Sequence, residues 1–268
     1  MVTTNGYFAA DGAARRVSRE LALLLGGGRA LLLQVAHPLV AAGVAEHSGY
    51  RENPWKRLEG TMNAVWAIVF GTRAQADRAA RRVRAMHGKV RGNLPEAMGR
   101  YPAGTPYRAD DPELLLWILF TLVDSGIVVY RRYVGPMSRD EEAAYWEDYR
   151  VVGRLFGLRK RDMPATLDDL DAYRRRMLEG DELHVTPWAR QRAREIVLEP
   201  PVPRVARPLV EAVNFTTIAL LPDRIRREYG FGALPPAFVR KAVVRGASEY
   251  TKRLVMPLLP GRIRLVPR

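Results

Sequence analysis

The sequence predicts an all-α protein of about nine to eleven helices. Nearly every segment carries helix start and stop signals, whereas the alternation of apolar and polar residues that is typical of strands is almost absent. With 268 residues, 47% of them hydrophobic, the chain is long enough to bury a core of its own. We expect a single domain, in which an N-terminal helix (1–29) and a basic C-terminal helix and tail (231–268) pack on the main body (30–230).

The N-terminal half contains four predicted helices and a short apolar run. An amphipathic segment, 15–25, is expected to break at Gly26, Gly27 and Gly28, and a short apolar run then leads to His37 and Pro38. Proline is favoured in the first turn of a helix, so a new helix is expected from Pro38 towards His47. Gly71 closes the next one, which covers 56–70. Thr72 and Gln75 form a capping box that opens the helix carrying His87, whose regular part we expect over 78–92.

Asp111 and Pro112 open a long apolar helix that extends to about Tyr133. Its most apolar window, 114–123, is too short to span a bilayer, so a buried core helix is expected. An unpaired buried carboxylate is costly, so Asp124 should pair with an arginine. The remaining predicted elements are a helix capped by Ser138 and Glu141, helices at 167–179, from 187, at 208–220 and at 238–256, and a proline-rich linker at 200–203.

The formal net charge of +14 is concentrated in the C-terminal segment, where residues 222–268 contain 11 basic and 3 acidic residues. This basic tail favours weak contact with an anionic membrane surface. No helix-turn-helix and no aromatic platform accompanies the basic residues, so no nucleic-acid partner is expected. There is no cysteine, which excludes disulfides, thiolate-bound haem and iron–sulfur clusters. Residues 1–10 lack the features of a signal peptide, and a cytoplasmic location is expected.

His87 is the candidate metal ligand. It is four residues after Val83 and three before Val90, so its imidazole is expected to point inward with Val83, Met86 and Val90. An inward imidazole surrounded by arginines suits a non-covalently bound haem, with nitrogen on iron and cations near the propionates. Arg84 and Arg91 are the candidate propionate partners. The alternative is a hydrogen-bonded core histidine on a solvated basic helix.

Other chemistries have little support. His-Glu-x-x-His, Gly-x-Ser-x-Gly and a phosphate loop are absent, which disfavours zinc proteases, serine hydrolases and nucleotide binding. A two-histidine, one-carboxylate metal site assembled from His37, His47 and Glu46 remains an alternative. Arg57 and Thr61, one helical turn apart, could present a cation and a hydroxyl to a pocket, although a salt bridge is the alternative for Arg57.

Several motifs in order resemble the MpaB-type oxygenase and rubber oxygenase (latex-clearing protein) family over about residues 30–230. They are Gln34 to Val44 (QVAHPLVAAGV) with His47-Ser48, Arg57-Leu58 with Thr61, Phe70-Gly71, Val83 to Gly92 with His87, Asp111 to Leu115 with Trp117, Thr121 to Ser125, Gly135 to Ser138, Gly157, Pro164, Tyr173 and Leu221-Pro222.

The resemblance implies an all-helical fold with a globin-like core and a b-type haem held by His87. It also implies oxidation of isoprenoid double bonds by dioxygen, with Arg57 and Thr61 on the distal side of the haem. Glu46 is the candidate for the family's catalytic glutamate. The chain departs from the pattern at Gly60, where the distal lysine stands in latex-clearing protein, and at Leu119, where many relatives have histidine. Without that lysine, five-coordinate or water-ligated iron is expected.

The sequence therefore favours a haem-b oxygenase that acts with dioxygen on a small apolar substrate, isoprenoid or lipid-like. In this interpretation His37 shapes the pocket or hydrogen-bonds near the haem. The alternatives are a non-catalytic haem- or lipid-binding protein and a peripheral membrane or interaction protein.

Overall fold

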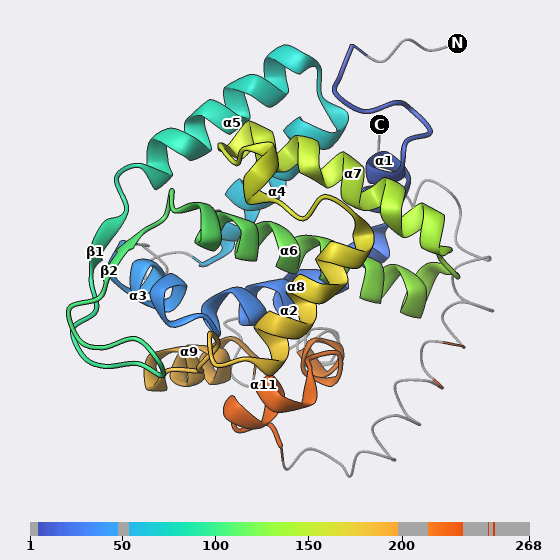
Figure 1. The fold of residues 1–268 in the computed structure, drawn as a ribbon. Coiled ribbons are helices and arrows are strands. Elements are labelled where there is room, and N and C mark those ends of the chain that lie inside the picture. The colour runs from blue at the N-terminus through green and yellow to red at the C-terminus, as the bar shows by residue number, and fades with distance from the viewer. Residues whose placement is uncertain (1–4, 48–53, 198–213, 233–245, 247–248, 250–268) are drawn as a thin grey trace.

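A computed structural model of the chain describes residues 5–47, 54–197, 214–232, 246 and 249, without the side chains at 54–59, 61–62 and 196–197. It confirms the all-α prediction, and Figure 1 shows helices arranged around one central helix. In chain order the elements are α1 (Ala13–Ser18), the 3-10 helix η1 (Leu21–Leu24), α2 (Leu25–Val35), α3 (Pro38–His47), α4 (Pro54–Phe70), α5 (Arg73–His87), β1 (Arg91–Asn93), β2 (Pro106–Arg108), α6 (Pro112–Val129), the π-helix η3 (Tyr130–Val134), α7 (Arg139–Phe156), the 3-10 helix η4 (Lys160–Asp162), α8 (Leu167–Glu179), α9 (Pro187–Val197) and α11 (Asp223–Glu228).

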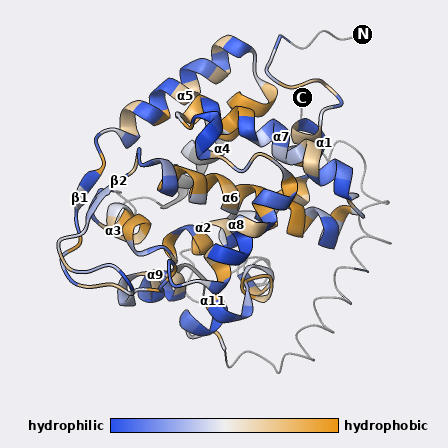
Figure 2. Ribbon diagram, in the orientation of Figure 1, coloured by the Kyte–Doolittle hydropathy of each residue, from blue (hydrophilic) through white to orange (hydrophobic). Residues whose placement is uncertain are grey.

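The central helix is α6, which is apolar on nearly all sides and packs against α2 and α7 (Figure 2). Asp111 caps its N-terminus and Pro112 occupies its first turn, as the sequence predicts. Trp117 is fully buried, and its indole N–H donates to the Leu33 carbonyl 3.2 Å away. Together with η3, α6 is long and apolar enough to cross a membrane, but 67% of its most apolar window is buried inside the fold. The apolar surface of α6 is therefore mostly buried in the core of the fold.

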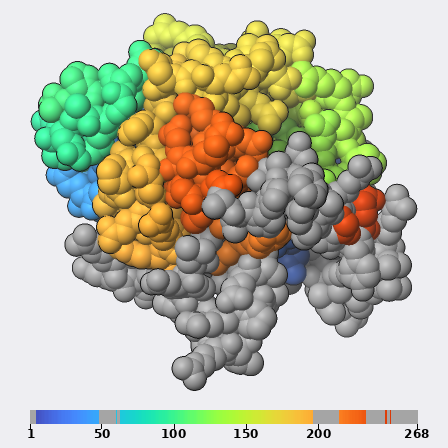
Figure 3. Space-filling model, turned by 90° about the horizontal axis from the view of Figure 1, so that it is seen from below, coloured from blue at the N-terminus to red at the C-terminus, as the bar shows by residue number. Residues whose placement is uncertain are grey.

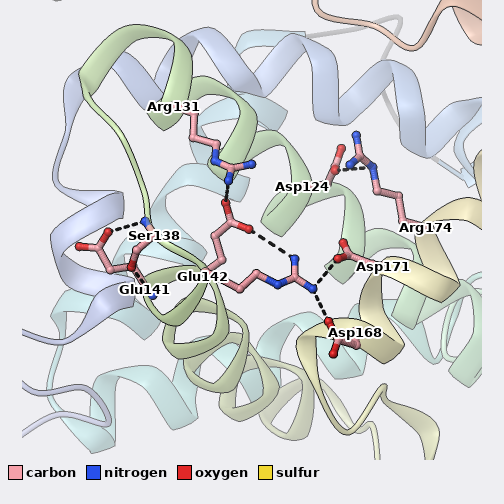
Figure 4. A network of polar contacts seen from close by, with 9 residues as sticks. Asp124, Arg131, Ser138, Glu141, Glu142, Asp168, Asp171 and Arg174 are labelled. Atoms are coloured by element: carbon pink, nitrogen blue, oxygen red, sulfur yellow. Dashed lines mark hydrogen bonds and ion pairs between the residues drawn. The ribbon is translucent and has the colours of Figure 1, made fainter.

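The buried ion pair between Arg29 of α2 and Asp124 of α6 connects the two helices. An Arg29 Nη atom lies 2.6 Å from an Asp124 carboxylate oxygen, and their side chains are 1% and 7% exposed. Arg29 also donates to the Ser125 hydroxyl (2.8 Å) and the Leu220 carbonyl (2.9 Å). Arg174 of α8 reaches Asp124 from the other side, at 3.2 Å (Figure 4). The predicted pairing of Asp124 with arginine is thus confirmed.

A second charge network connects η3, α7 and α8 (Figure 4). The Glu142 carboxylate of α7 is buried, and it lies 2.7 Å from the guanidinium group of Arg131 in η3. Arg139 lies 3.8 Å from Glu142 and also pairs with Asp168 and Asp171 at the start of α8. These contacts hold the N-terminal end of α8 to α7, and they hold α7 to η3, which follows α6.

The expected break at Gly26, Gly27 and Gly28 is wrong, because α2 continues through all three glycines. A Cβ at Gly28 would lie 2.6 Å from the Thr217 hydroxyl, and one at Gly26 would lie 3.2 Å from a Val129 methyl group. The glycines therefore let α2 approach its neighbours closely. The chain then bends by 103° between the segments 21–35 and 38–47, at His37.

The predicted helix over 78–92 is also shifted, since α5 covers Arg73–His87 and Gly88 is its C-cap. The capping box of Thr72 and Gln75 is present at its start, as predicted. After Gly88 the chain forms a two-stranded antiparallel ribbon in which Arg91 pairs with Arg108, an element that sequence periodicity did not indicate. The predicted linker at 200–203 and the helix at 238–256 fall largely outside the described residues, and the proposed domain limits remain a prediction.

Removal of the Asp124 carboxylate should be strongly destabilising, because Arg29 would stay buried without a countercharge. We expect Asp124→Ala to lower the free energy of unfolding by about 3–5 kcal/mol. Arg108→Ala, which removes an exposed pair with Asp110, should cost less than about 1 kcal/mol. Urea unfolding of the two variants checks this. Equal losses of unfolding free energy in the two variants would contradict a special role for the buried ion pair.

Candidate functional site

His87 is the last residue of α5 and lies on the helix's inner side. Ala76 and Ala80 on this side are buried, Val83 is half-buried, and His87 follows Val83 by one turn. Burial lowers the pKa of His87, and the charge of Asp110 partly opposes this effect. The imidazole is therefore neutral at pH 7, and no hydrogen bond joins it to another described residue. The inward orientation holds for Val83, but Met86 is 57% exposed and does not belong to the inner side.

Glu46 lies at the end of α3, which packs on the ribbon that follows His87. The Tyr107 hydroxyl donates a hydrogen bond to Glu46 Oε2. Next to it, His47 Nε2 lies 3.0 Å from the Arg91 carbonyl. A Cβ at Gly92 would lie 2.5 Å from the Tyr107 hydroxyl and 3.0 Å from Glu46 Oε2, so glycine is required for this close approach. The structure thus brings the Glu46 carboxylate next to the chain segment that leaves His87.

Arg57 and Thr61 belong to α4, but their side chains lie outside the described residues. The backbone still restricts their position, because α4 and α5 form a hairpin about Gly71 and pack against each other. Arg57 lies 13 residues before the end of α4 and His87 lies 14 residues after the start of α5. At 1.5 Å per residue, both are about 20 Å from the turn. They therefore occupy the same end of the hairpin.

The two predicted propionate partners do not converge in the structure. The Arg91 guanidinium donates to the Gly88 carbonyl and so caps the end of α5. Arg84 is exposed, and its Cδ lies 3.8 Å from the Cβ position of Gly157, at the end of α7. Both arginines are on the surface, so their role towards a haem remains a prediction.

His37 lies at the opposite end of α3 from Glu46. Nine residues of helix separate the two by about 14 Å, so the two-histidine, one-carboxylate site is not assembled. No group of three or more metal-ligating side chains occurs among the described residues. His37 is 5% exposed, and its Nε2 lies 3.3 Å from the Tyr101 hydroxyl. Its Nδ1 is buried without a hydrogen-bond partner in the described structure.

The electrostatics of His37 follow from this burial. Desolvation, together with the nearby charge of Arg100, lowers the pKa of His37 to about 4. The ring is therefore neutral over the physiological range. Tyr101 belongs to the long loop between the two ribbon strands, so this loop covers the bend between α2 and α3.

The two departures from the family pattern have different surroundings. Leu119 is 3% exposed and packs against α7, where its Cδ2 lies 2.9 Å from the Cβ position of Gly153. A histidine there would have to enter the core. Gly60, in contrast, is exposed on α4. The missing distal lysine therefore changes a surface of α4 and not a packed interior.

An open hollow of about 240 Å³ lies on α9, but it contains none of the predicted site residues. Its lining includes Pro187, Arg190 and Arg194. Figure 3 shows the face on which α9 (amber) and α11 (orange) lie side by side, and Arg190 donates to the Glu228 carbonyl between them (2.9 Å). The hollow is open to solvent and its lining includes charged side chains, so it does not resemble an enclosed site for an apolar substrate.

Sequence reasoning missed two tyrosines, Tyr107 and Tyr101, that contact the predicted residues Glu46 and His37. Tyr107 is 3% exposed, and burial together with its hydrogen bond to Glu46 raises its pKa. It lies in a strand of three residues, which is too short for alternation to be recognised.

Comparison with known proteins gives one family. Residues 14–252 match the family model described as "ER-bound oxygenase mpaB/B'/Rubber oxygenase, catalytic domain". No curated protein and no solved structure matches the chain.

The neutral state of His37 predicts a pH dependence of stability. Between its unfolded pKa of 6.5 and its folded pKa of about 4, the unfolded chain binds more protons at this site, so the protein loses stability as the pH falls through this window. The full loss is about 3 kcal/mol. We expect His37→Gln to remove it, as measured by urea unfolding above and below the window. The other histidines are common to both proteins, so identical pH dependence in the variant and the wild type would contradict the assignment.

Proposed function

Because the chain belongs to the family of MpaB and rubber oxygenase catalytic domains, we propose that it is a haem-b-dependent oxygenase acting on a small apolar substrate. The family implies an oxygenase-type role, with dioxygen and an organic substrate as partners. The finer assignment to haem and to an isoprenoid or lipid-like substrate rests on the residues around His87.

The observation that carries the proposal is the state of His87. A haem needs an axial nitrogen that is neutral, oriented inward and not engaged elsewhere. His87 is half-buried, its pKa is lowered by burial, and its imidazole makes no hydrogen bond to a described residue. A thiolate ligand is ruled out because the chain has no cysteine. The donor chemistry thus fits a haem better than a multi-ligand metal centre.

The residues near the His87 end of the α4–α5 hairpin would supply the other roles that an oxygenase needs. Bound haem would supply the iron that binds and activates dioxygen. His87 would hold that iron through its neutral nitrogen. The Glu46 carboxylate, fixed on one oxygen by the Tyr107 hydroxyl, would accept a proton from substrate on its other oxygen. Arg57 and Thr61 would donate hydrogen bonds from α4. The desolvated surroundings that lower the pKa of His87 would also favour the binding of an apolar substrate.

Haem binding provides the direct test. Purified protein titrated with haemin should develop an intense near-ultraviolet haem band, and His87→Ala should lose it because the axial nitrogen is gone. His184→Ala is the matched control, since His184 is exposed in the loop before α9. Without a lysine at Gly60, the spectrum should be that of five-coordinate or water-ligated iron. Equal binding by His87→Ala, with native circular dichroism, would refute the axial role of His87.

Product formation separates an oxygenase from a haem carrier. Haem-loaded protein given an isoprenoid alkene under dioxygen should form carbonyl products, and Glu46→Gln should form fewer, by about 10²–10⁴-fold. Mass spectrometry of the products checks this. Tight haem binding without any product from a panel of alkenes would favour the non-catalytic alternative.

A further inference from the structure

The outward side of α5 carries three arginines that have no partner in the part of the chain that the structure describes. Arg78, Arg81 and Arg82 are spaced at i, i+3 and i+4, so they share one side of the helix, and all three are exposed. None of them makes a hydrogen bond or an ion pair with a described residue. We refer to these three residues as the α5 cationic face. Lys89, also exposed, follows just beyond the end of the helix.

This lack of countercharge distinguishes the α5 cationic face from other exposed arginines. Arg108 and Arg159 are each fixed by two hydrogen bonds to an aspartate carboxylate, Asp110 and Asp162 respectively. The only acidic residue of α5 is Asp77, and its carboxylate accepts a hydrogen bond from Tyr7 (2.6 Å). The positive charge of the α5 cationic face is therefore available to an external anion.

The position of α5 suits an extended surface more than a small ligand. Figure 1 shows α5 at the edge of the molecule, and Figure 2 shows its outward side as hydrophilic. From Arg78 to Arg82 the charges follow the helix axis over about 6 Å, and no carboxylate closes them into a pocket. Two alanines separate Arg78 from Arg81, and no phenylalanine, tyrosine or tryptophan occurs in α5 to stack on nucleic-acid bases.

We propose that the α5 cationic face docks the protein on an anionic lipid membrane surface. Charge complementarity carries the proposal, since basic residues near anionic headgroups each add to the affinity. Met86, 57% exposed beside these arginines, supplies an apolar side chain at the same edge. The choice of a membrane over another polyanion rests on the proposed function, because apolar substrates partition into bilayers. Docking by α5 leaves its inner side, which carries His87, free to face the core.

Vesicle sedimentation tests the proposal with the full-length chain and without haem. The probes are vesicles of phosphatidylcholine alone and of phosphatidylcholine mixed with phosphatidylserine. The wild type should bind only the mixed vesicles, and added salt should weaken binding. In Arg78→Gln/Arg81→Gln/Arg82→Gln, binding should weaken by about fivefold per arginine, or on the order of 100-fold in total.

A matched variant controls for net charge. Arg108→Gln/Arg159→Gln/Arg161→Gln removes the same charge from exposed arginines that pair with aspartates, and it should keep most of the binding. Equal binding by both triple variants would overturn the proposal and assign any binding to net charge or to another segment. Displacement of the protein from mixed vesicles by duplex DNA at equal phosphate concentration would overturn the choice of lipid. Since haem is absent from the assay, its failure leaves the proposed function unaffected.

Discussion

The structure depends on the buried ion pair between Arg29 and Asp124. Two charges with 1% and 7% exposure are tolerated only because they are 2.6 Å apart and because the arginine has further acceptors. This requirement fixes α2 along α6 in one register. The 103° bend after α2 then sets the direction of α3. As a result, the far end of α3, with Glu46 and His47, lies against the ribbon that follows His87.

The two sides of α5 illustrate how one helix can serve separate purposes. Its inner side consists of small residues, Ala76 and Ala80, which allow close packing and end in His87. Its outer side carries arginines that the rest of the described chain leaves unpaired. A capping box fixes the start of the helix, and Arg91 donates to the carbonyl of its C-cap residue, Gly88. The helix ends are therefore stabilised locally, and the sides remain available for a cofactor and for a partner.

Local signals predicted most of the fold. Capping residues such as Thr72, Ser138 and Thr166 mark helix starts at the correct positions, because a side chain that bonds the first free N–H groups acts within four residues. The glycines of α2 predicted a break that the structure does not have, because they allow close approach to Thr217 and Val129, which are distant in sequence. The ribbon after Gly88 was missed for a similar reason: strands of three residues are specified by their partner.

The candidate site was predictable in its parts but not in its assembly. The position of His87 followed from helical periodicity, which is a local property. The hydrogen bond from Tyr107 to Glu46 could not be foreseen, because 61 residues separate the two in the chain. In the same way, the surface positions of Arg84 and Arg91 depend on the end of α5, which the sequence placed five residues too late.

The central claim is that His87 is the ligand of a haem iron. Diffraction from crystals grown with haemin, with data collected at the iron absorption edge, locates the metal independently of spectra or activity. The account predicts one iron peak within bonding distance of a His87 ring nitrogen. An iron peak beside His37, His47 or His184, or a haem bound with His87 turned away from the metal, would contradict it.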